Sequence, residues 1–208
     1  QRHALLRNMH EHRLFDADAI EVWDAQLIPS GNYIHAQRKN FLAEFIPVFK
    51  RFYEQIGQNS EEVEISYRSQ LLEDKFENLL LASSKKDLLT QYTNTGIHKD
   101  DLIFTIKGHP IKKFGSQGQQ KSFVIAMRLY QFDWLKHHKG QKPVLLLDDI
   151  FDKLDNERVE RLIGLVSADY FGQVLITDTD PNRMRALFDK LPGQTQLFQI
   201  IDQQALPL

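Results

Sequence analysis

The sequence predicts an α/β fold in which a helical N-terminal part precedes a C-terminal part built on a mainly parallel sheet. In the first half, apolar residues recur at helical spacing over residues 18–57. In the second half, two short apolar runs, residues 144–147 and 174–177, flank a segment of helical character. Strand, helix and strand together have the size of a βαβ unit, whose two strands run parallel. We therefore expect a helical region with one short strand over residues 1–95 and an α/β region over residues 96–208.

The composition is that of a folded globular protein. Of the 208 residues, 42% are hydrophobic and 26% are charged, which excludes a disordered or collagen-like chain. The 26 Lys and Arg residues nearly balance 28 Asp and Glu residues, which does not indicate a histone-like cationic coat but allows a local basic patch. The absence of cysteine excludes a disulfide, a thiolate zinc site and a cysteine nucleophile. No apolar run reaches the length of a membrane span, so a cytoplasmic protein without membrane contact is expected.

Helical segments are expected throughout the first 57 residues. Apolar residues before residue 10 predict a short first helix. Asp18 is expected to be the N-cap of the next segment. Pro29, with Gly31 close behind it, and Pro47 interrupt the apolar pattern. We therefore expect residues 18–57 to form either a kinked helix or two to three helices in series.

Strand patterns follow this helical stretch. Residues 62–68 alternate strictly between polar and apolar side chains, which predicts a strand with one face toward solvent. Residues 102–106 and 111–114 flank a turn at Gly108, and a short hairpin explains both runs. Between these strands, two short helices are expected over residues 71–82 and 84–92.

Helices and strands alternate in the rest of the chain. A largely apolar helix over residues 119–138, closed by Gly140, is expected to be buried. The apolar run 144–147, stopped by Asp148, is typical of a strand buried on both faces. The last predicted elements are a helix over residues 156–167 that Asp155 can cap, a strand over residues 174–177, a helix from Asp180 and a strand over residues 196–202.

Carboxylates follow both strands of the predicted parallel pair. Asp148 and Asp149 follow the first strand, and Asp178 and Asp180 follow the second. Ligands bind beyond the carboxyl ends of the strands in open α/β sheets. A lone Asp there usually ends a strand or caps a helix. Two adjacent carboxylates against a buried strand repel each other and lose hydration, an arrangement that usually requires a cation or a protonated partner. The Asp148–Asp149 pair therefore predicts a metal or a metal-bound nucleotide, because Mg²⁺ takes one or two carboxylates together with phosphate oxygens and water.

A second feature is the polar start of the long helix at residues 116–121. Free backbone N–H groups and the positive end of the helix dipole favour a phosphate at such a start. Gly118 allows close approach, Ser116 can cap the helix or donate a hydrogen bond, and Lys121 adds positive charge. Ser and Gly also begin many helices for structural reasons alone, so this pattern gains weight only from its context.

The order of these elements resembles the C-terminal lobe of an ABC-type ATPase head. The Ser-x-Gly-Gln start at residues 116–119 matches the signature motif, and the apolar strand closed by two acids at residues 144–149 matches the Walker B strand. Three further segments resemble the RecF family of DNA replication and repair proteins. Residues 96–102 are similar to its Gly-Pro-His-Arg-Asp-Asp-Leu element, and residues 22–27 and 66–69 are similar to its helical arm. Since no G-x-x-x-x-G-K-[ST] motif occurs, the chain resembles the C-terminal three-fifths of that family, a helical arm followed by the ATPase lobe without the Walker A lobe.

This resemblance implies ATP and Mg²⁺ as cofactors and gives roles to particular residues. Asp148 would hold the metal, and Asp149 would be the catalytic carboxylate where many ABC ATPases have Glu, so that hydrolysis would be slow. The signature motif would face ATP held by a second head, with the Ser116 hydroxyl satisfied only across that interface. The residues that would contact nucleotide are Ser116, Gln117, Gly118, Gln119, Lys121, Asp155 and Thr177.

The resemblance also implies a function in DNA replication, recombination, repair and the SOS response. Two intact heads would sandwich ATP as a homodimer, and the dimer would hold single- or double-stranded DNA at gaps or junctions. RecO- and RecR-type mediators would then help to load recombinase. The 208 residues alone would be inactive as an ATPase.

Two other classes of function remain open. A metal-dependent nuclease or phosphotransferase could use Asp148, Asp149, Asp178 and Asp180, since Asp178-Thr179-Asp180 has the D-x-D form of some two-metal sites, although a Glu on a preceding strand is missing. A purely structural helical arm would leave the Asp148–Asp149 pair unexplained.

Overall fold

The computed structural model describes residues 1–57, 61–149, 151–189 and 195–207. The chain forms two compact units, the first made of residues 1–47 and 63–110 and the second of residues 48–62 and 111–208. The boundary expected at residue 95 differs from this division, because the strand that begins at Asp101 pairs with a strand of the first unit. The assignment of residues 1–95 to an arm and residues 96–208 to an ATPase lobe stays a prediction.

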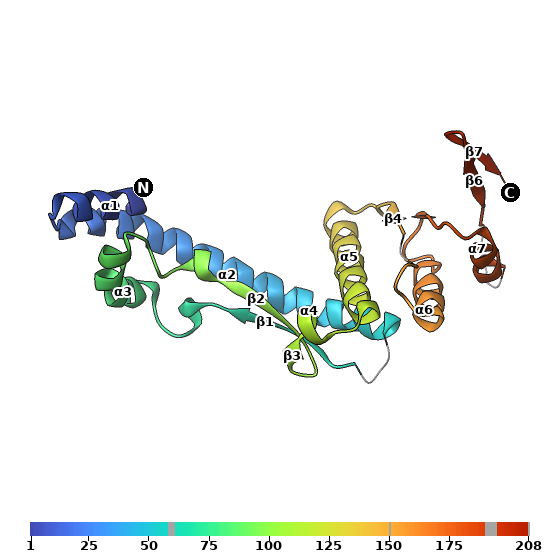
Figure 1. The fold of residues 1–208 in the computed structure, drawn as a ribbon, viewed down its shortest axis with the longest axis horizontal. Coiled ribbons are helices and arrows are strands. Elements are labelled where there is room, and N and C mark those ends of the chain that lie inside the picture. The colour runs from blue at the N-terminus through green and yellow to red at the C-terminus, as the bar shows by residue number, and fades with distance from the viewer. Residues whose placement is uncertain (58–60, 150, 190–194, 208) are drawn as a thin grey trace. The chain divides into compact units, whose positions relative to one another are not determined.

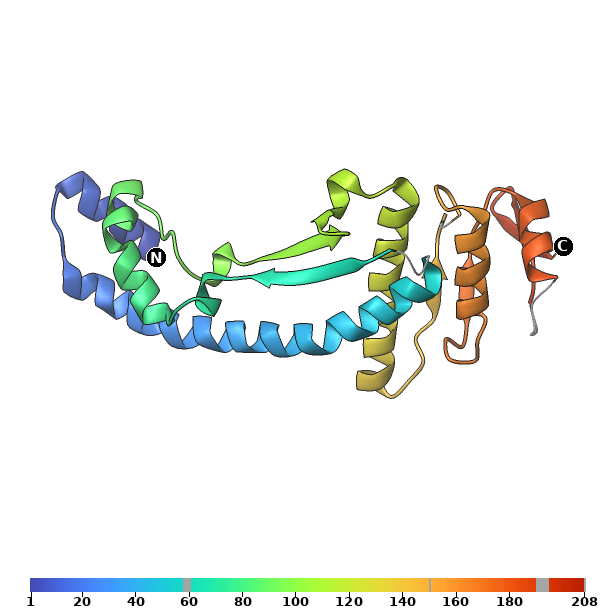
Figure 2. The ribbon, with the colours of Figure 1, turned by 90° about the horizontal axis from the view of Figure 1, so that it is seen from below.

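The first unit combines helices with an antiparallel sheet (Figure 1). Its elements are α1 (Arg2–His12), the larger part of α2 (Ala17–Ile56), β1 (Val63–Arg68), the 3-10 helices η1 (Gln70–Leu72) and η2 (Ile97–Lys99), α3 (Phe76–Thr90), β2 (Asp101–Ile106) and β3 (His109–Pro110). Helices α1 and α3 lie beside one another, as Figures 1 and 2 both show. Buried Leu6, Met9 and Ile20 form a core there, with Leu88 packed against it.

Helix α2 is continuous through both prolines. The prediction of two to three helices in series is therefore wrong, and the N-cap is Asp16 instead of Asp18, since the Asp16 carboxylate accepts the Ala19 N–H over 3.0 Å. Gly31 does not end a helix. It admits the ring of Phe76, because a Cβ at Gly31 would lie 2.4 Å from that ring.

The sheet of the first unit confirms one predicted strand, but the hairpin differs from the prediction. Strand β1 alternates as expected, and it pairs antiparallel with β2 from Val63 opposite Ile106 to Arg68 opposite Asp101. The turn at Gly108 is present, but β3 is only two residues long and residues 111–114 form a short helix. Pro110 lacks an N–H for a longer ladder, which explains the early end of β3. The two helices expected over residues 71–92 are a 3-10 turn followed by the single helix α3.

The second unit begins with the end of α2 and continues from residue 111. Its other elements are α4 (Ile111–Phe114), α5 (Gln117–Lys139), β4 (Leu145–Leu147), α6 (Asn156–Val166), β5 (Val174–Ile176), α7 (Pro181–Phe188), β6 (Phe198–Ile201) and β7 (Gln204–Pro207). Helix α5 ends at Gly140 in the left-handed conformation, as predicted. The ring of Phe123 in α5 is buried, and its centroid lies 4.6 Å from the ring centroid of Phe49 in α2, within an aromatic core.

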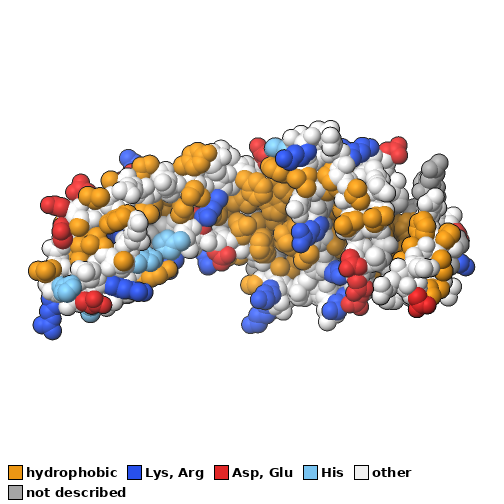
Figure 3. All heavy atoms as spheres, turned by 90° about the horizontal axis from the view of Figure 1, so that it is seen from above, with side chains coloured by type: hydrophobic (Ala, Val, Ile, Leu, Met, Phe, Trp, Pro, Cys, Tyr) orange, Lys and Arg blue, Asp and Glu red, His pale blue; other side chains and the backbone are white. Residues whose placement is uncertain are grey.

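Strands β4 and β5 pair in parallel, which confirms the predicted βαβ unit. The expectation that β4 is buried on both faces is wrong for the described residues. Leu145 and Leu147 are buried, but Leu146 is 67% exposed and its register partner Leu175 is 52% exposed. The core of this unit therefore covers one face of the pair. Hydrophobic side chains reach the surface at several places on the face of the molecule drawn in Figure 3.

The last predicted strand is β6, and it belongs to a hairpin. It pairs antiparallel with β7, through a turn in which Asp202 and Gln203 both have positive φ. Two consecutive residues of positive φ are typical of a tight hairpin turn. None of the described helices combines the length and apolar character needed to span a membrane.

Candidate functional site

The carboxyl ends of β4 and β5 bring together three of the predicted site residues. The Thr177 hydroxyl donates a hydrogen bond to the Asp148 carboxylate and accepts the backbone N–H of Asp149 over 3.1 Å. The Thr177 N–H donates to the carbonyl of Leu147 over 3.0 Å, which continues the ladder of the parallel pair. Thr177 therefore fixes the position of both acidic residues.

Both carboxylates of the pair are exposed to solvent. The expectation that Asp148 and Asp149 lose hydration against a buried strand is therefore wrong. Asp149 has a φ of 47°, a left-handed conformation that Asp tolerates better than most residues. Two exposed, adjacent carboxylates at a strand end suit a hydrated Mg²⁺ that takes its other ligands from water and phosphate. Across the described residues, no group of three or more His, Asp or Glu side chains could hold a metal without such external ligands.

The start of α5 is fixed by a reciprocal cap. The Ser116 Oγ accepts the Gln119 N–H over 3.2 Å, and the Gln119 Oε1 accepts the Ser116 N–H over 2.8 Å. The Gln119 side chain also donates to Glu61 over 2.9 Å. The expectation that Ser116 is satisfied only across an interface is therefore wrong, since its oxygen already serves as a cap within the chain. Gln117, the first residue of α5, is exposed.

The start of α5 also contacts the loop that follows β4. Lys121 Nζ donates to the backbone carbonyl of Asp149 over 3.1 Å. A Cβ on Gly118 would lie 3.3 Å from the carbonyl oxygen of Lys153 and 3.6 Å from the Nε of Arg158. Gly118 therefore serves close packing within the chain. The signature-like helix start and the acidic strand end, predicted separately, thus lie in contact.

Asp155 has a structural partner in the first turn of α6. Its carboxylate accepts the Arg158 N–H over 2.8 Å and the Arg158 Nε over 3.0 Å. The backbone N–H of Arg158 is the main cause that lowers the pKa of Asp155. The cap at Asp155 was predicted from the sequence, but the buried ion pair of Arg158 and Glu61 was not. The spacing of Asp155 and Arg158 could have indicated the local pair, whereas no sequence pattern relates Glu61 to α6.

The two acids after β5 do not join the Asp148–Asp149 pair in one metal site. Asp178 forms two hydrogen bonds with the guanidinium of Arg183, at 2.8 and 2.6 Å. Burial alone would raise the pKa of Asp178, but the bonds from Arg183 hold it below its ordinary value. Asp180 caps α7 by accepting the N–H groups of Asn182 and Arg183. These contacts leave the four-carboxylate nuclease site without structural support.

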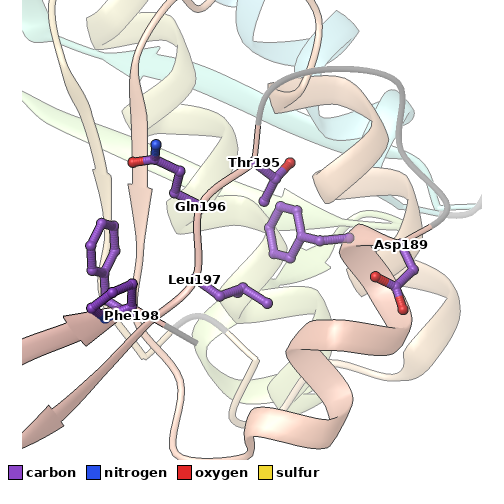
Figure 4. A pocket seen from close by; sticks show the side chains of 7 residues that line it. Asp189, Thr195, Gln196, Leu197 and Phe198 are labelled. Carbon is purple, nitrogen blue, oxygen red and sulfur yellow. The ribbon is translucent and has the colours of Figure 1, made fainter.

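A separate pocket lies beside the C-terminal hairpin (Figure 4). It is lined by Phe188, Asp189, Thr195, Gln196, Leu197, Phe198 and Pro207. None of the predicted nucleotide or metal residues lines it.

Comparison with curated proteins gives strong matches over almost the whole chain. The chain is 46% identical over 200 residues to the DNA replication and repair protein RecF of Flavobacterium johnsoniae, which covers 96% of the chain and 56% of that protein. It is 41% identical over 203 residues to RecF of Phocaeicola vulgatus, with 97% of the chain and 54% of that protein covered. The chain belongs to the RecF family. No family model matches it, and it spans about half the length of the RecF proteins it matches.

Solved RecF structures have the same fold. A structure of the recombination mediator protein RecF with ATP is 26% identical, with a TM-score of 0.72 over 100% of the chain and 54% of that protein. A second RecF structure, 24% identical, has a TM-score of 0.70. The predicted fold class, a helical arm with the C-terminal lobe of an ABC-type ATPase head, is therefore confirmed.

Proposed function

We propose that this chain provides the Walker B strand and the signature helix of a RecF-type ATPase of DNA replication and repair. The observation that carries the proposal is the contact between the acidic strand end and the α5 start, made by Lys121 and the Asp149 carbonyl over 3.1 Å. The helix N-terminus suits a phosphate and the two exposed carboxylates suit Mg²⁺, and this contact fixes the spacing of the two features within the chain. The names of the RecF relatives and the RecF structure with ATP support the same function.

The residues divide the chemistry between metal and water. We propose that Asp148, oriented by Thr177, holds Mg²⁺ through its water shell, and that Asp149 polarises the attacking water. Bound Mg²⁺ would supply charge neutralisation on the phosphate oxygens. Gln117, Gly118 and the Ser116 O–H would face the phosphates of ATP held by a second copy of the intact protein.

We further propose an ATP-dependent homodimer that binds DNA at gaps or junctions and works with RecO- and RecR-type mediators in recombinase loading. The description of the structural relative as a recombination mediator supports this part of the proposal. A nuclease function has less support, because Asp178 and Asp180 are engaged by Arg183 and by α7.

The decisive experiment compares the 208-residue chain with an intact protein that contains it. We expect slow, DNA-responsive ATP hydrolysis by the intact protein and negligible hydrolysis by the 208 residues alone. Retention on gapped DNA should require ATP and the intact protein. Hydrolysis by the 208-residue chain at the rate of the intact protein would contradict the proposal, and Mg²⁺-dependent cleavage of DNA without ATP would favour the nuclease.

A further inference from the structure

A buried arginine lies behind the candidate site in the first turn of α6. Arg158 is 5% exposed, and its guanidinium contacts three residues, two of which, Glu61 and Ser122, are distant from it in sequence. It donates to both carboxylate oxygens of Glu61, to the Ser122 Oγ over 3.0 Å and to the Asp155 carboxylate over 3.0 Å. These four hydrogen bonds come from the Nε and both terminal nitrogens of one planar guanidinium, whereas a Lys ammonium has only three donors.

Glu61 extends these contacts to one more element, α2, and adds a second contact with α5. It accepts the Tyr53 hydroxyl of α2 and the Gln119 amide of α5, each over 2.9 Å. Burial would raise the pKa of Glu61, but hydrogen bonds from Arg158, Gln119 and Tyr53 together hold it below its ordinary value. The ion pair is therefore charged at neutral pH. Helix α5 is attached to it twice, through Gln119 and through Ser122.

The remaining attachment is to the loop after β4. Asp155 ends that loop, and the Gly118 backbone of α5 packs closely against Lys153 and Arg158. Nucleotide contacts are proposed for the α5 start, and the resemblance to the RecF family implies one for Asp155, the last residue of the segment 152–155. A buried ion pair is weak evidence for stability, because its desolvation cost offsets much of its attraction. Its placement between these two segments points to a role in their relative position.

We propose that Arg158 is a positioning residue that holds the start of α5 and residues 152–155 at a fixed spacing for nucleotide-driven dimerisation. This inference rests on the proposed function. Arg158 reaches no nucleotide itself. It acts on α5 directly through Ser122 and indirectly through Glu61, which binds Gln119. It acts on residues 152–155 through Asp155. Loss of the guanidinium fork lets the two segments move independently, and small misplacements of positioned groups cost large factors in rate.

The test is Arg158→Lys in the intact protein, since Lys keeps the charge but has too few donors for the four hydrogen bonds to Glu61, Ser122 and Asp155. The matched control is Arg161→Lys, in the same helix, where the arginine contacts Glu157 and the Gly57 carbonyl instead. For Arg158→Lys we expect half-saturation by ATP to stay within about twofold of the parent, while kcat and the ATP-induced dimer fraction fall about tenfold or more. Amide hydrogen exchange without nucleotide should rise together in residues 117–120 and 152–155. Arg161→Lys should change none of these.

A second variant keeps the inference testable if Arg158→Lys does not fold. Ser122→Ala removes one attachment of α5 and leaves the ion pair intact, so exchange should rise in residues 117–120 alone, with a smaller loss of kcat. Parent-like amide exchange and kcat in the variants that fold would overturn the inference. A lower melting temperature without a rise in exchange or a fall in kcat would also overturn it. If the parent protein neither dimerises with ATP nor hydrolyses it, the proposed function fails, while the exchange measurement still decides whether Arg158 fixes the two segments.

Discussion

The backbone N–H of Asp149 donates to the Thr177 hydroxyl over 3.1 Å, and that hydroxyl donates onward to the Asp148 carboxylate. One side chain at the end of β5 thus orders both acids at the end of β4. The arrangement depends on the parallel register of the two strands, which places their carboxyl ends at one edge. The hydrogen bond to Thr177 also accommodates the left-handed backbone conformation of Asp149, because it gives the N–H group of that residue an acceptor.

Thr177→Val should disturb metal binding in the intact protein. The change keeps the shape of the side chain but removes both hydrogen bonds, so Asp148 loses its donor and the Asp149 N–H its acceptor. We expect the free energy of Mg²⁺ binding in the presence of ATP to become less favourable by about 0.5–1.5 kcal/mol, which corresponds to roughly two- to tenfold weaker binding. Titration of Mg²⁺ at fixed ATP measures it. Thr177→Ser keeps the hydroxyl and should behave like the parent; equal effects of Val and Ser would show that the hydroxyl is not the cause.

Asp148→Asn and Asp149→Asn should separate nucleotide binding from hydrolysis. Removing the charge of Asp148 should weaken binding of Mg²⁺ with ATP, since the first acid orients the metal's water shell. Removing the charge of Asp149 should spare binding and slow hydrolysis about a hundredfold, since this acid polarises the attacking water. Equilibrium binding and single-turnover hydrolysis distinguish the two. Normal hydrolysis by both variants would refute the Walker B assignment.

Local patterns in the sequence predict most of the elements correctly. The alternation of β1, the glycine that closes α5 and the cap at Asp155 each depend on neighbouring residues, so they are visible without the fold. The continuity of α2 is not local. Its prolines lie within a helix held by packing, and Gly31 is required by the ring of Phe76 from another helix. A glycine that permits a close tertiary contact looks in sequence like a helix end.

The candidate site divides in the same way. Sequence order identified the acidic strand end and the polar helix start, and the structure brings them into contact through Lys121. Burial was predicted less well, since Asp148 and Asp149 are exposed at a strand whose outer face is open. Glu61 and Arg158 could not be paired from the sequence, because 97 residues separate them.

Gly31→Ala and Gly164→Ala should have opposite effects on stability. A Cβ at Gly31 would lie 2.4 Å from the Phe76 ring, so helices α2 and α3 must shift, at a cost of about 1–3 kcal/mol in the free energy of unfolding. A Cβ at Gly164, within α6, meets nothing within 4 Å, so Ala should stabilise that helix by about 0.5–1 kcal/mol. Thermal unfolding by circular dichroism measures both. A neutral Gly31→Ala would show that the two helices are less closely packed than described.

Asp178→Asn should destabilise the chain in a manner that depends on pH. Asp178 is almost fully buried and binds Arg183 through two hydrogen bonds, which keep its pKa below the ordinary value. A carboxylate with a lowered pKa in the folded state contributes stability above its unfolded pKa and loses it as the pH falls through the folded value. Since Arg183 is partly exposed, we expect a loss of only about 1–2 kcal/mol near pH 7.

That difference between parent and variant should stay constant down to about pH 5 and shrink below about pH 4, where the carboxylate of the unfolded chain becomes protonated. It should be lost as the pH falls through the lower pKa of the folded state. Urea unfolding at several pH values measures it, and Asp169→Asn, at an exposed carboxylate in the same unit, serves as the control. The control should change stability by less than about 0.5 kcal/mol at every pH. A destabilisation by Asp178→Asn that is as large at pH 3 as at pH 7 would mean that lost packing, and not the charged pair with Arg183, is responsible.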